Sequence, residues 1–203
     1  MGKLILTSCG YLHIVPKCNN IIENVAKKKK VLIINNATIT GSNKAANQIL
    51  PETFSRIADC VDIVTITPEN IDMIFDYDVV YIAGGDAEPL LELAKNSNVK
   101  EKLEEFLEND GIIIGESFGS MIFGKSLRYI YDIKKGTKPK YDKELDSYNG
   151  FGFLDINIYP HWDKAKDELK QKTEEYEKEH DIVITKMCDG DYITIDVPSK
   201  QKE

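Results

Sequence analysis

A serine framed by glycines is the residue of this chain whose surroundings point most directly to chemistry. Residues 111–119 run Gly-Ile-Ile-Ile-Gly-Glu-Ser-Phe-Gly, so Ser117 lies in a G-x-S-x-G pattern. Residues 112–114 are a short β-branched apolar run, typical of a buried strand. Where such a strand turns sharply into a helix, the serine oxygen is exposed in a strained turn. The pattern predicts a nucleophile for acyl transfer, with an ordinary glycine-rich turn as the alternative.

A nucleophilic serine needs a base beside it, and this chain has three histidines to choose from. A serine hydroxyl becomes nucleophilic near neutral pH only next to such a base, and a histidine titrates in that range. His161 follows an apolar run and Pro160, where a strand end is expected. His13 and His180 have no such context, so we expect them to be structural or solvent-facing.

Length and composition describe an ordinary globular protein. The chain has 203 residues, which suits a single domain over 1–203, with 42% hydrophobic and 30% charged residues. Its net charge of -8 argues against nucleic acid or an anionic membrane surface as a partner. No apolar run has membrane-spanning length, and the N-terminus lacks a signal-peptide pattern. We therefore expect a cytoplasmic protein.

The cysteines show no metal-binding arrangement. Cys9, Cys18, Cys60 and Cys188 are scattered without metal-ligand spacing. In the expected compartment their thiols would be reduced. The sequence therefore predicts neither a metal site nor a cofactor.

Strands alternate with helices through the first two-thirds of the chain. This order predicts an α/β fold, a mostly parallel sheet with helices on both faces. In such sheets, sites gather at the carboxyl ends of the strands. Asn35, Gly84-Gly85 and Ser117 would all lie on that edge. The strands are expected at residues 3–9, 31–34, 61–66, 78–83 and 112–114.

Other segments carry weaker expectations. A helix opening at Ser42 should break or restart at Pro51. Thr67-Pro68-Glu69 is typical of a helix start, and residues 134–149 of an exposed loop. Residues 164–180 predict a solvated helix. Residues 182–185 and 192–197 predict an antiparallel hairpin around an Asp-Gly turn.

Four motifs together resemble the peptidase E family of serine peptidases, the S51 group of aspartyl dipeptidase and cyanophycinase. The resemblance covers most of the chain and implies a fold like that of class I glutamine amidotransferases. It implies that Ser117 attacks, that His161 is the base, and that Gly85 and Phe118 donate backbone N–H groups to an oxyanion hole. The motifs are Gly-Gly-Asp at 84–86, Gly-Glu-Ser-Phe-Gly-Ser at 115–120, Gly-Phe-Gly-Phe-Leu at 150–154 and Pro-His-Trp-Asp at 160–163.

Two carboxylates are candidates for the acid that orients His161. Asp132 follows the nucleophile at a spacing sometimes used in this family. Asp189 stands near the C-terminus, where relatives often carry Glu-Gly, and an aspartate there has a shorter reach. We favour Asp189 because a turn between strands holds a side chain more rigidly than a segment leading into a loop. Turn chemistry alone also explains an Asp-Gly pair.

The chain departs from the family pattern at the nucleophile and beyond the histidine. Phe118 and Ser120 replace alanines, and the bulky Phe118 raises the alternative of a non-catalytic small-molecule-binding member of the fold. An arginine that binds the substrate carboxylate in the aspartyl dipeptidase branch is missing. We therefore expect weak or no preference for an N-terminal aspartate. In the stretch where that arginine is expected, the basic residues are all lysines, namely Lys164, Lys166, Lys170 and Lys172.

The sequence thus predicts a serine peptidase or dipeptidase that hydrolyses small peptides by acyl transfer with a Ser-His-Asp triad. An esterase using the same G-x-S-x-G pattern is the alternative within enzymes. The expected partner is a small peptide substrate. No nucleic acid or membrane partner is expected, and the chain should be a monomer or a weak homodimer.

Overall fold

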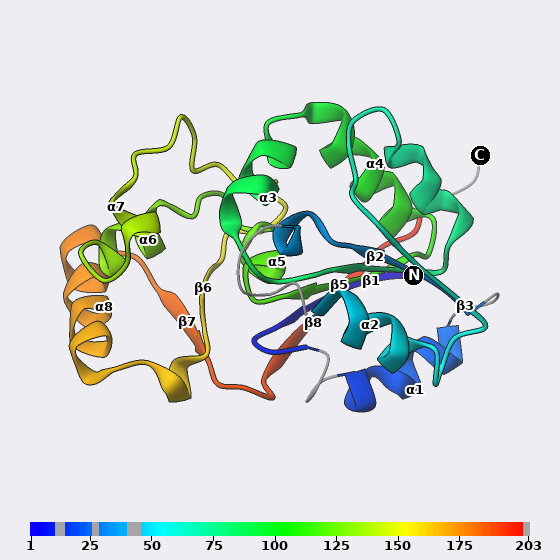
Figure 1. Ribbon diagram of the computed structural model, residues 1–203, viewed down its shortest axis with the longest axis horizontal. Coiled ribbons are helices and arrows are strands. Elements are labelled where there is room, and N and C mark those ends of the chain that lie inside the picture. Colours follow the sequence, from blue (N-terminus) through cyan, green and yellow to red (C-terminus); the bar gives the residue numbers. More distant parts are fainter. Residues whose placement is uncertain (11–14, 26–28, 40–45, 201–203) are drawn as a thin grey trace.

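A six-stranded sheet forms the centre of the structure, a computed structural model that describes residues 1–10, 15–25, 29–39 and 46–200 (Figure 1). Its strand order is β3-β2-β4-β5-β1-β8. Neighbouring strands are parallel except β8, which runs antiparallel to β1. This is the mostly parallel α/β sheet that the sequence predicts. The strands are β1 (Gly2–Thr7), β2 (Lys30–Ile34), β3 (Cys60–Val64), β4 (Val79–Ile82), β5 (Ile112–Glu116) and β8 (Tyr192–Val197).

Helices cover both faces of this sheet (Figure 1). One face packs against α1 and α2, and the other against α3 and α4. Residues of β2 alternate accordingly: Val31 and Ile33 belong to one buried cluster, whereas Leu32 and Ile34 belong to the other. Burial on both faces explains why the central strands are continuous apolar runs. The helices are α1 (Val15–Val25), α2 (Ala46–Phe54), α3 (Ala87–Ala94) and α4 (Ser97–Glu108).

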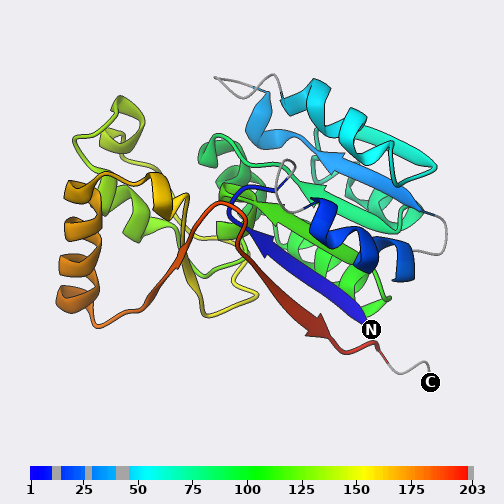
Figure 2. The same cartoon turned by 90° about the horizontal axis from the view of Figure 1, so that it is seen from below.

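A smaller two-stranded parallel sheet lies beside the main one, with its own helices (Figures 1 and 2). Its strands are β6 (Asn157–Pro160) and β7 (Ile184–Met187). Between β7 and β8 the chain crosses from the small sheet to the main one (Figure 2). The neighbouring helices are α6 (Arg128–Lys134), α7 (Pro139–Asp142) and α8 (Asp167–His180), and the short elements are α5 (Phe118–Met121), η1 (Asn36–Thr38), η3 (Ile71–Asp76) and η4 (Trp162–Lys164).

The expected C-terminal hairpin is wrong. β7 pairs with β6, with Tyr159 opposite Lys186, while β8 pairs with β1, with Thr7 opposite Tyr192. An Asp-Gly turn permits a hairpin, but the choice of partner strand depends on tertiary packing that the local pattern does not encode. As a result the turn containing Asp189 lies between two sheets.

Three smaller expectations also need correction. Helix α2 runs through Pro51, because burial of Leu50 and Phe54 offsets the lost backbone hydrogen bond. The residues after Thr67 form a turn and then the 3₁₀ helix η3 instead of an α-helix. The segment 134–149 is not simply an exposed loop, since Tyr141 in α7 is buried against Tyr131 at 5.3 Å between ring centroids. The expected start at Ser42 lies outside the described residues.

Candidate active site

Ser117 occupies the sharp turn between β5 and α5. Its backbone has φ 50° and ψ -114°, a conformation that a non-glycine residue adopts only under strain. The turn is held by the Ser117 N–H, which donates to the Thr7 carbonyl at 2.9 Å, and by the Ser120 N–H, which donates to the Ser117 carbonyl at 2.9 Å. The G-x-S-x-G segment therefore has the elbow geometry that the sequence predicts.

The glycines around this elbow are required by close packing. A Cβ on Gly119 would lie 2.2 Å from the Ile82 carbonyl oxygen. A Cβ on Gly84, in the turn after β4, would lie 2.9 Å from the Ser117 Cβ. Side chains at these positions would push β4 and the elbow apart. The Gly-Gly turn and the serine are thus immediate neighbours at the carboxyl edge of the sheet.

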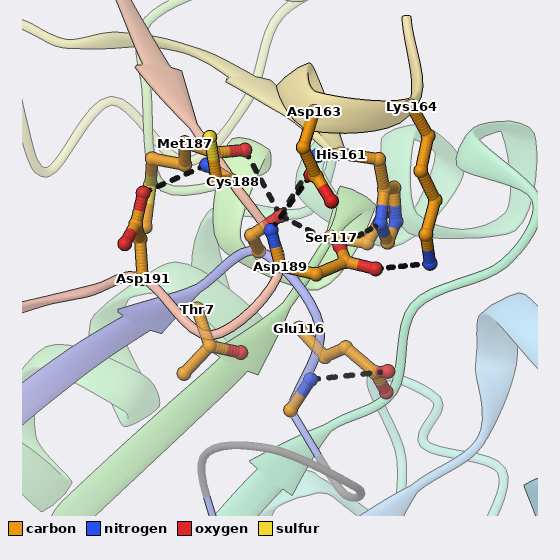
Figure 3. Close-up of polar contacts among 12 residues, drawn as sticks. Thr7, Glu116, Ser117, His161, Asp163, Lys164, Met187, Cys188, Asp189 and Asp191 are labelled. Carbon is orange, nitrogen blue, oxygen red and sulfur yellow. Dashed lines mark hydrogen bonds and ion pairs between the residues drawn. The ribbon is translucent and has the colours of Figure 1, made fainter.

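His161 reaches Ser117 from the end of β6. Its Nε2 lies 3.2 Å from the Ser117 Oγ (Figure 3). The residue has a left-handed backbone, with φ 58° and ψ 37°, and its N–H donates to the Ser8 Oγ at 2.8 Å. This hydrogen bond ties the strained backbone of His161 to the end of β1. The imidazole is thereby aimed at the elbow.

Asp189 lies on the other side of the imidazole. Its Oδ1 is 2.5 Å from the His161 Nδ1, and its side chain is only 6% exposed (Figure 3). Because the carboxylate can only accept, Nδ1 carries the proton and Nε2 presents its lone pair to Ser117. The Asp189 N–H donates to the Asp163 Oδ1 at 2.9 Å, which fixes the turn. The aspartate therefore reaches the imidazole directly, despite its shorter side chain.

The second oxygen of this carboxylate pairs with the Lys164 ammonium (Figure 3). Burial opposes ionisation of Asp189, but hydrogen bonds from Lys164 and His161 outweigh it and hold the pKa of the carboxyl below its ordinary value. Asp189 is thus an anion at neutral pH, available to stabilise a positive imidazolium.

Asp132, the other candidate acid, is engaged elsewhere. Arg128, one turn earlier in α6, donates to both of its carboxylate oxygens from Nε, at 2.9 and 3.0 Å. The Tyr176 hydroxyl donates to it from α8 at 3.3 Å. The structure therefore brings Asp189 together with Ser117 and His161 and gives Asp132 a different set of partners.

Gly85 and Phe118, the expected oxyanion donors, flank the serine. Gly85 has φ 152°, and a Cβ there would lie 2.1 Å from the Ala37 carbonyl oxygen. Phe118 is the first residue of α5, and the first N–H groups of a helix lack intrahelical acceptors. Across the described ranges, neither N–H has a hydrogen-bond partner. Phe118 is 7% exposed, and its side chain belongs to the buried core cluster.

Two buried serines support this arrangement, and sequence reasoning missed their roles. Ser8 is fully buried, accepts from the His161 N–H, and lies 3.4 Å from the Asp189 Oδ1. The Ser120 hydroxyl accepts from the Thr7 N–H at 2.8 Å and lies 2.7 Å from the Gly115 carbonyl oxygen. It therefore joins β1 to β5 behind Ser117. For Ser120, the serine at a position where the family usually has alanine was a signal of this role. No sequence signal pointed to Ser8.

Glu116, directly before Ser117, has a buried carboxyl group. Its Oε2 accepts from the Tyr81 hydroxyl at 2.9 Å, and its Oε1 from the Gly10 N–H at 3.3 Å. The Gly84 N–H lies 3.5 Å from Oε2. Burial raises the pKa of Glu116, although these hydrogen bonds act in the opposite direction. The carboxyl thus links the ends of β1, β4 and β5 beneath the site.

This raised pKa makes stability depend on pH. In the unfolded chain the carboxyl ionises at its ordinary value of 4.5, whereas the folded protein resists ionisation until a higher pH. The contribution of Glu116 is therefore full below 4.5 and declines as pH rises through the folded pKa. We expect the wild type to lose stability relative to Glu116→Gln over that window, by about 1.4 kcal/mol for each pH unit that separates the folded pKa from the unfolded one. Denaturant titrations of both proteins across pH measure this difference.

Glu101→Gln, at an exposed position of α4, is the matched control. Its unfolding free energy should follow that of the wild type at every pH. Parallel profiles for wild type and Glu116→Gln would contradict the assignment of a raised pKa to Glu116.

The remaining histidines lie away from this site or outside the described ranges. His180 stacks on Tyr176 at 3.8 Å between ring centroids, on the exposed side of α8. His13 lies outside the described residues. In the described ranges, no group of three or more His, Cys, Asp and Glu side chains is arranged to hold a metal ion. No helix there is long and apolar enough to cross a bilayer.

A comparison with protein families places this chain in a known group. The sequence profile of Peptidase family S51 matches residues 4–200. The chain belongs to this family. It is therefore a serine peptidase, a hydrolase, and the resemblance drawn from its four motifs is confirmed.

Individual relatives agree with this membership. The chain is 25% identical over 177 residues to an uncharacterized peptidase, Lmo0363, from Listeria monocytogenes serovar 1/2a, covering 85% of this chain and 84% of that protein. Among solved structures, a candidate peptidase E protein from Listeria monocytogenes EGD-e superposes with a TM-score of 0.71 at 20% identity, covering 97% of this chain and 99% of that one. A peptidase from an acI-B1 Actinobacterium superposes with a TM-score of 0.69 at 17% identity, covering 96% and 83%. These likenesses in structure establish the fold of the S51 chain.

Proposed function

We propose that this S51 peptidase hydrolyses small peptides by acyl transfer, with Ser117 as nucleophile, His161 as base and Asp189 as orienting acid. The observation that carries the proposal is the continuous contact from Asp189 Oδ1 through the imidazole to the Ser117 Oγ, at 2.5 and 3.2 Å. The elbow exposes the serine oxygen, and the buried carboxylate selects the tautomer that a base requires. The burial of Phe118 in the core also supports catalysis over a non-catalytic binding role.

The proposed reaction follows from these positions. The Ser117 Oγ attacks the peptide carbonyl carbon while His161 Nε2 takes its proton, and Asp189 stabilises the imidazolium. The carbonyl oxygen becomes an oxyanion, which the Gly85 and Phe118 N–H groups would bind. The imidazolium then protonates the leaving amine as the C–N bond breaks. Water hydrolyses the acyl-serine by the same route and restores the hydroxyl.

A serine-directed fluorophosphonate tests the nucleophile directly. We expect stoichiometric labelling of the folded wild type, with the adduct located on Ser117 by peptide mass mapping. Ser55→Ala, which removes an exposed serine of α2's C-terminal turn, is the matched control and should label equally. Failure of the wild type to label would favour a non-catalytic binding protein.

A substrate panel separates the two enzymatic alternatives. Dipeptides and aminoacyl anilides should be cleaved with kcat/KM values at least as high as those for matched acyl esters. Esters cleaved far better than every peptide in the panel would favour an esterase on the same elbow.

A further inference from the structure

A basic pocket adjoins the proposed active site on the His161 side. It has a volume of about 450 Å³ and lies between the α6–α7 segment and the start of α8. That volume falls within the range of small-ligand sites, roughly 300–1,000 Å³. Its lining includes His161 and Lys164, whereas neither Ser117 nor Gly85 borders it. The pocket is thus continuous with the catalytic base and displaced from the expected oxyanion donors.

Lys134, the last residue of α6, is the least solvated cation of this pocket. Its Nζ lies 4.8 Å from the centroid of the Tyr159 ring and 5.4 Å from that of Tyr141. Within the described residues, no carboxylate lies within ion-pair distance of this ammonium. The charges that act on it most strongly are those of Lys138 and Lys140, and both repel it. Lys134 is therefore a partly buried cation held between two aromatic faces without a protein counter-ion.

Two other lysines of the pocket, unlike Lys134, have a carboxylate partner. Lys172 pairs with Glu168 at 2.9 Å, and Lys164 pairs with Asp189. Glu168 is the one carboxylate among the pocket-lining residues, and Lys172 already engages it. The pocket thus has an excess of positive charge, and Lys134 is its partly buried cation without a carboxylate partner. Such a site is stabilised when an anion enters, because the anion supplies the missing counter-charge.

The position of His161 indicates which part of a peptide would enter. In acyl transfer the base delivers its proton to the leaving amine, so the leaving residue lies against the histidine. A pocket that shares the histidine as a wall therefore receives the leaving side of the scissile bond. In a dipeptide, that side carries the free C-terminal carboxylate.

We propose that this pocket binds a carboxylate on the leaving side of the substrate, with Lys134 as its anchor. This inference rests on the proposed peptidase function and adds the substrate class to it. The carboxylate is either the free C-terminus or an acidic side chain of the leaving residue. The acyl side carries no such requirement, in keeping with the missing arginine after His161.

Binding to Ser117→Ala protein tests the pocket separately from catalysis. Titration calorimetry compares Ala-Leu with Ala-Leu amide, and Ala-Glu amide with Ala-Gln amide, which separates the C-terminal source from the side-chain source. In at least one pair the carboxylate form should bind about ten- to hundredfold more tightly. Lys134→Met in the same background should remove most of that advantage. Equal binding of both members of both pairs would overturn the proposal.

Two controls make the result specific. Lys178→Met removes a lysine from the exposed surface of α8 outside the pocket, and it should leave the carboxylate advantage unchanged. Lys134→Arg keeps the charge and should retain a substantial part of the advantage. If Lys178→Met lowers the advantage as much as Lys134→Met, net charge explains the binding and the pocket does not.

A pH series on protein with the native pocket needs no lysine variant. Burial, together with Lys140 and Lys138, lowers the pKa of Lys134 to about 8. The carboxylate advantage should therefore be full near pH 7 and decline as pH rises through about 8. Tyr141 and Tyr159 have pKa values raised by burial, and Tyr159 titrates near 12, well above this window. From α8, Lys172 and Glu168 face the pocket as an ion pair. The other titratable or charged side chains that border the pocket are Lys135, Lys138, His161, Lys164 and Lys166. An advantage that stays constant to pH 9.5 would contradict Lys134 as the anchor.

Turnover by the wild type distinguishes failure of the proposed peptidase function from failure of the proposed carboxylate pocket. If no peptide is hydrolysed but Ser117→Ala still prefers carboxylate peptides, the pocket stands and the proposed function fails. If peptides are hydrolysed without any leaving-side preference, the proposed function stands and the pocket fails. A large advantage of Asp-Leu over Ala-Leu would show an anion site on the acyl side and contradict the statement that the acyl side carries no such requirement.

Discussion

Replacing Ser117 by alanine is expected to lower kcat for peptide hydrolysis by about 10⁶-fold, the scale seen when a triad nucleophile is removed from a serine protease. In the proposed mechanism Ser117 supplies the oxygen that forms the acyl intermediate, and alanine has no atom that can replace it. Ser117 has a strained φ of 50°. Alanine meets the same steric limits there as serine, so the substitution adds no backbone strain. The fold should therefore survive. Progress curves with a dipeptide panel measure the loss.

The comparison depends on showing that the variant is folded. Ser117→Ala should have a thermal unfolding midpoint close to that of the wild type, and it should lose fluorophosphonate labelling. Ser55→Ala should keep both activity and labelling. Equal turnover by wild type and Ser117→Ala would mean that another group performs the chemistry, and the proposed mechanism would be wrong.

Asp189→Asn is expected to lower kcat by on the order of 10⁴-fold, as in other triads that lose their orienting acid. The asparagine amide can donate to the His161 Nδ1, which would leave the proton on Nε2 and no lone pair facing Ser117. The neutral amide also withdraws the charge that stabilises the imidazolium. Steady-state kinetics at several pH values measure the loss, which should appear in kcat much more than in KM.

Asp132→Asn is the matched control for this change. It removes the same charge from a carboxylate that also has a cationic partner, Arg128, at 2.9 Å. Because its described partners are Arg128 and Tyr176, we expect kcat to change by about tenfold or less. In correctly folded proteins, a steep loss for Asp132→Asn and a mild one for Asp189→Asn would transfer the orienting role to Asp132.

Much of the fold could be predicted from the sequence because it is encoded in consecutive residues. The buried run at 112–114 and the paired glycines after β4 each carry a local signature of a strand end and a tight turn. The partner of β7 was not predictable in this way. Pairing with β6 joins Tyr159 to Lys186, residues far apart in the chain, and only tertiary packing selects it.

The site was predictable where its residues stand in local motifs, as with Ser117 and His161. The acid that orients His161 was harder to choose, because Asp189 and Asp132 both lie next to turns or loops. Neither stands in a sequence motif that identifies it. One available signal was overlooked: Arg128 and Asp132 are four residues apart, the spacing of an ion pair on a helix. Lys134 was not singled out at all, since its burial depends on Tyr141 and Tyr159, which come from α7 and β6.

The crossing of the chain between β7 and β8 affects how this enzyme can lose activity. Ser117 belongs to the main sheet, His161 to the end of the small sheet, and Asp189 to the connection between them. In the proposed mechanism, activity therefore requires that the two sheets stay docked against each other. A partial unfolding that loosens the small sheet would switch the peptidase off while the six-stranded sheet remained intact. Loss of activity would then indicate that the two sheets have separated, and it would precede unfolding of the core.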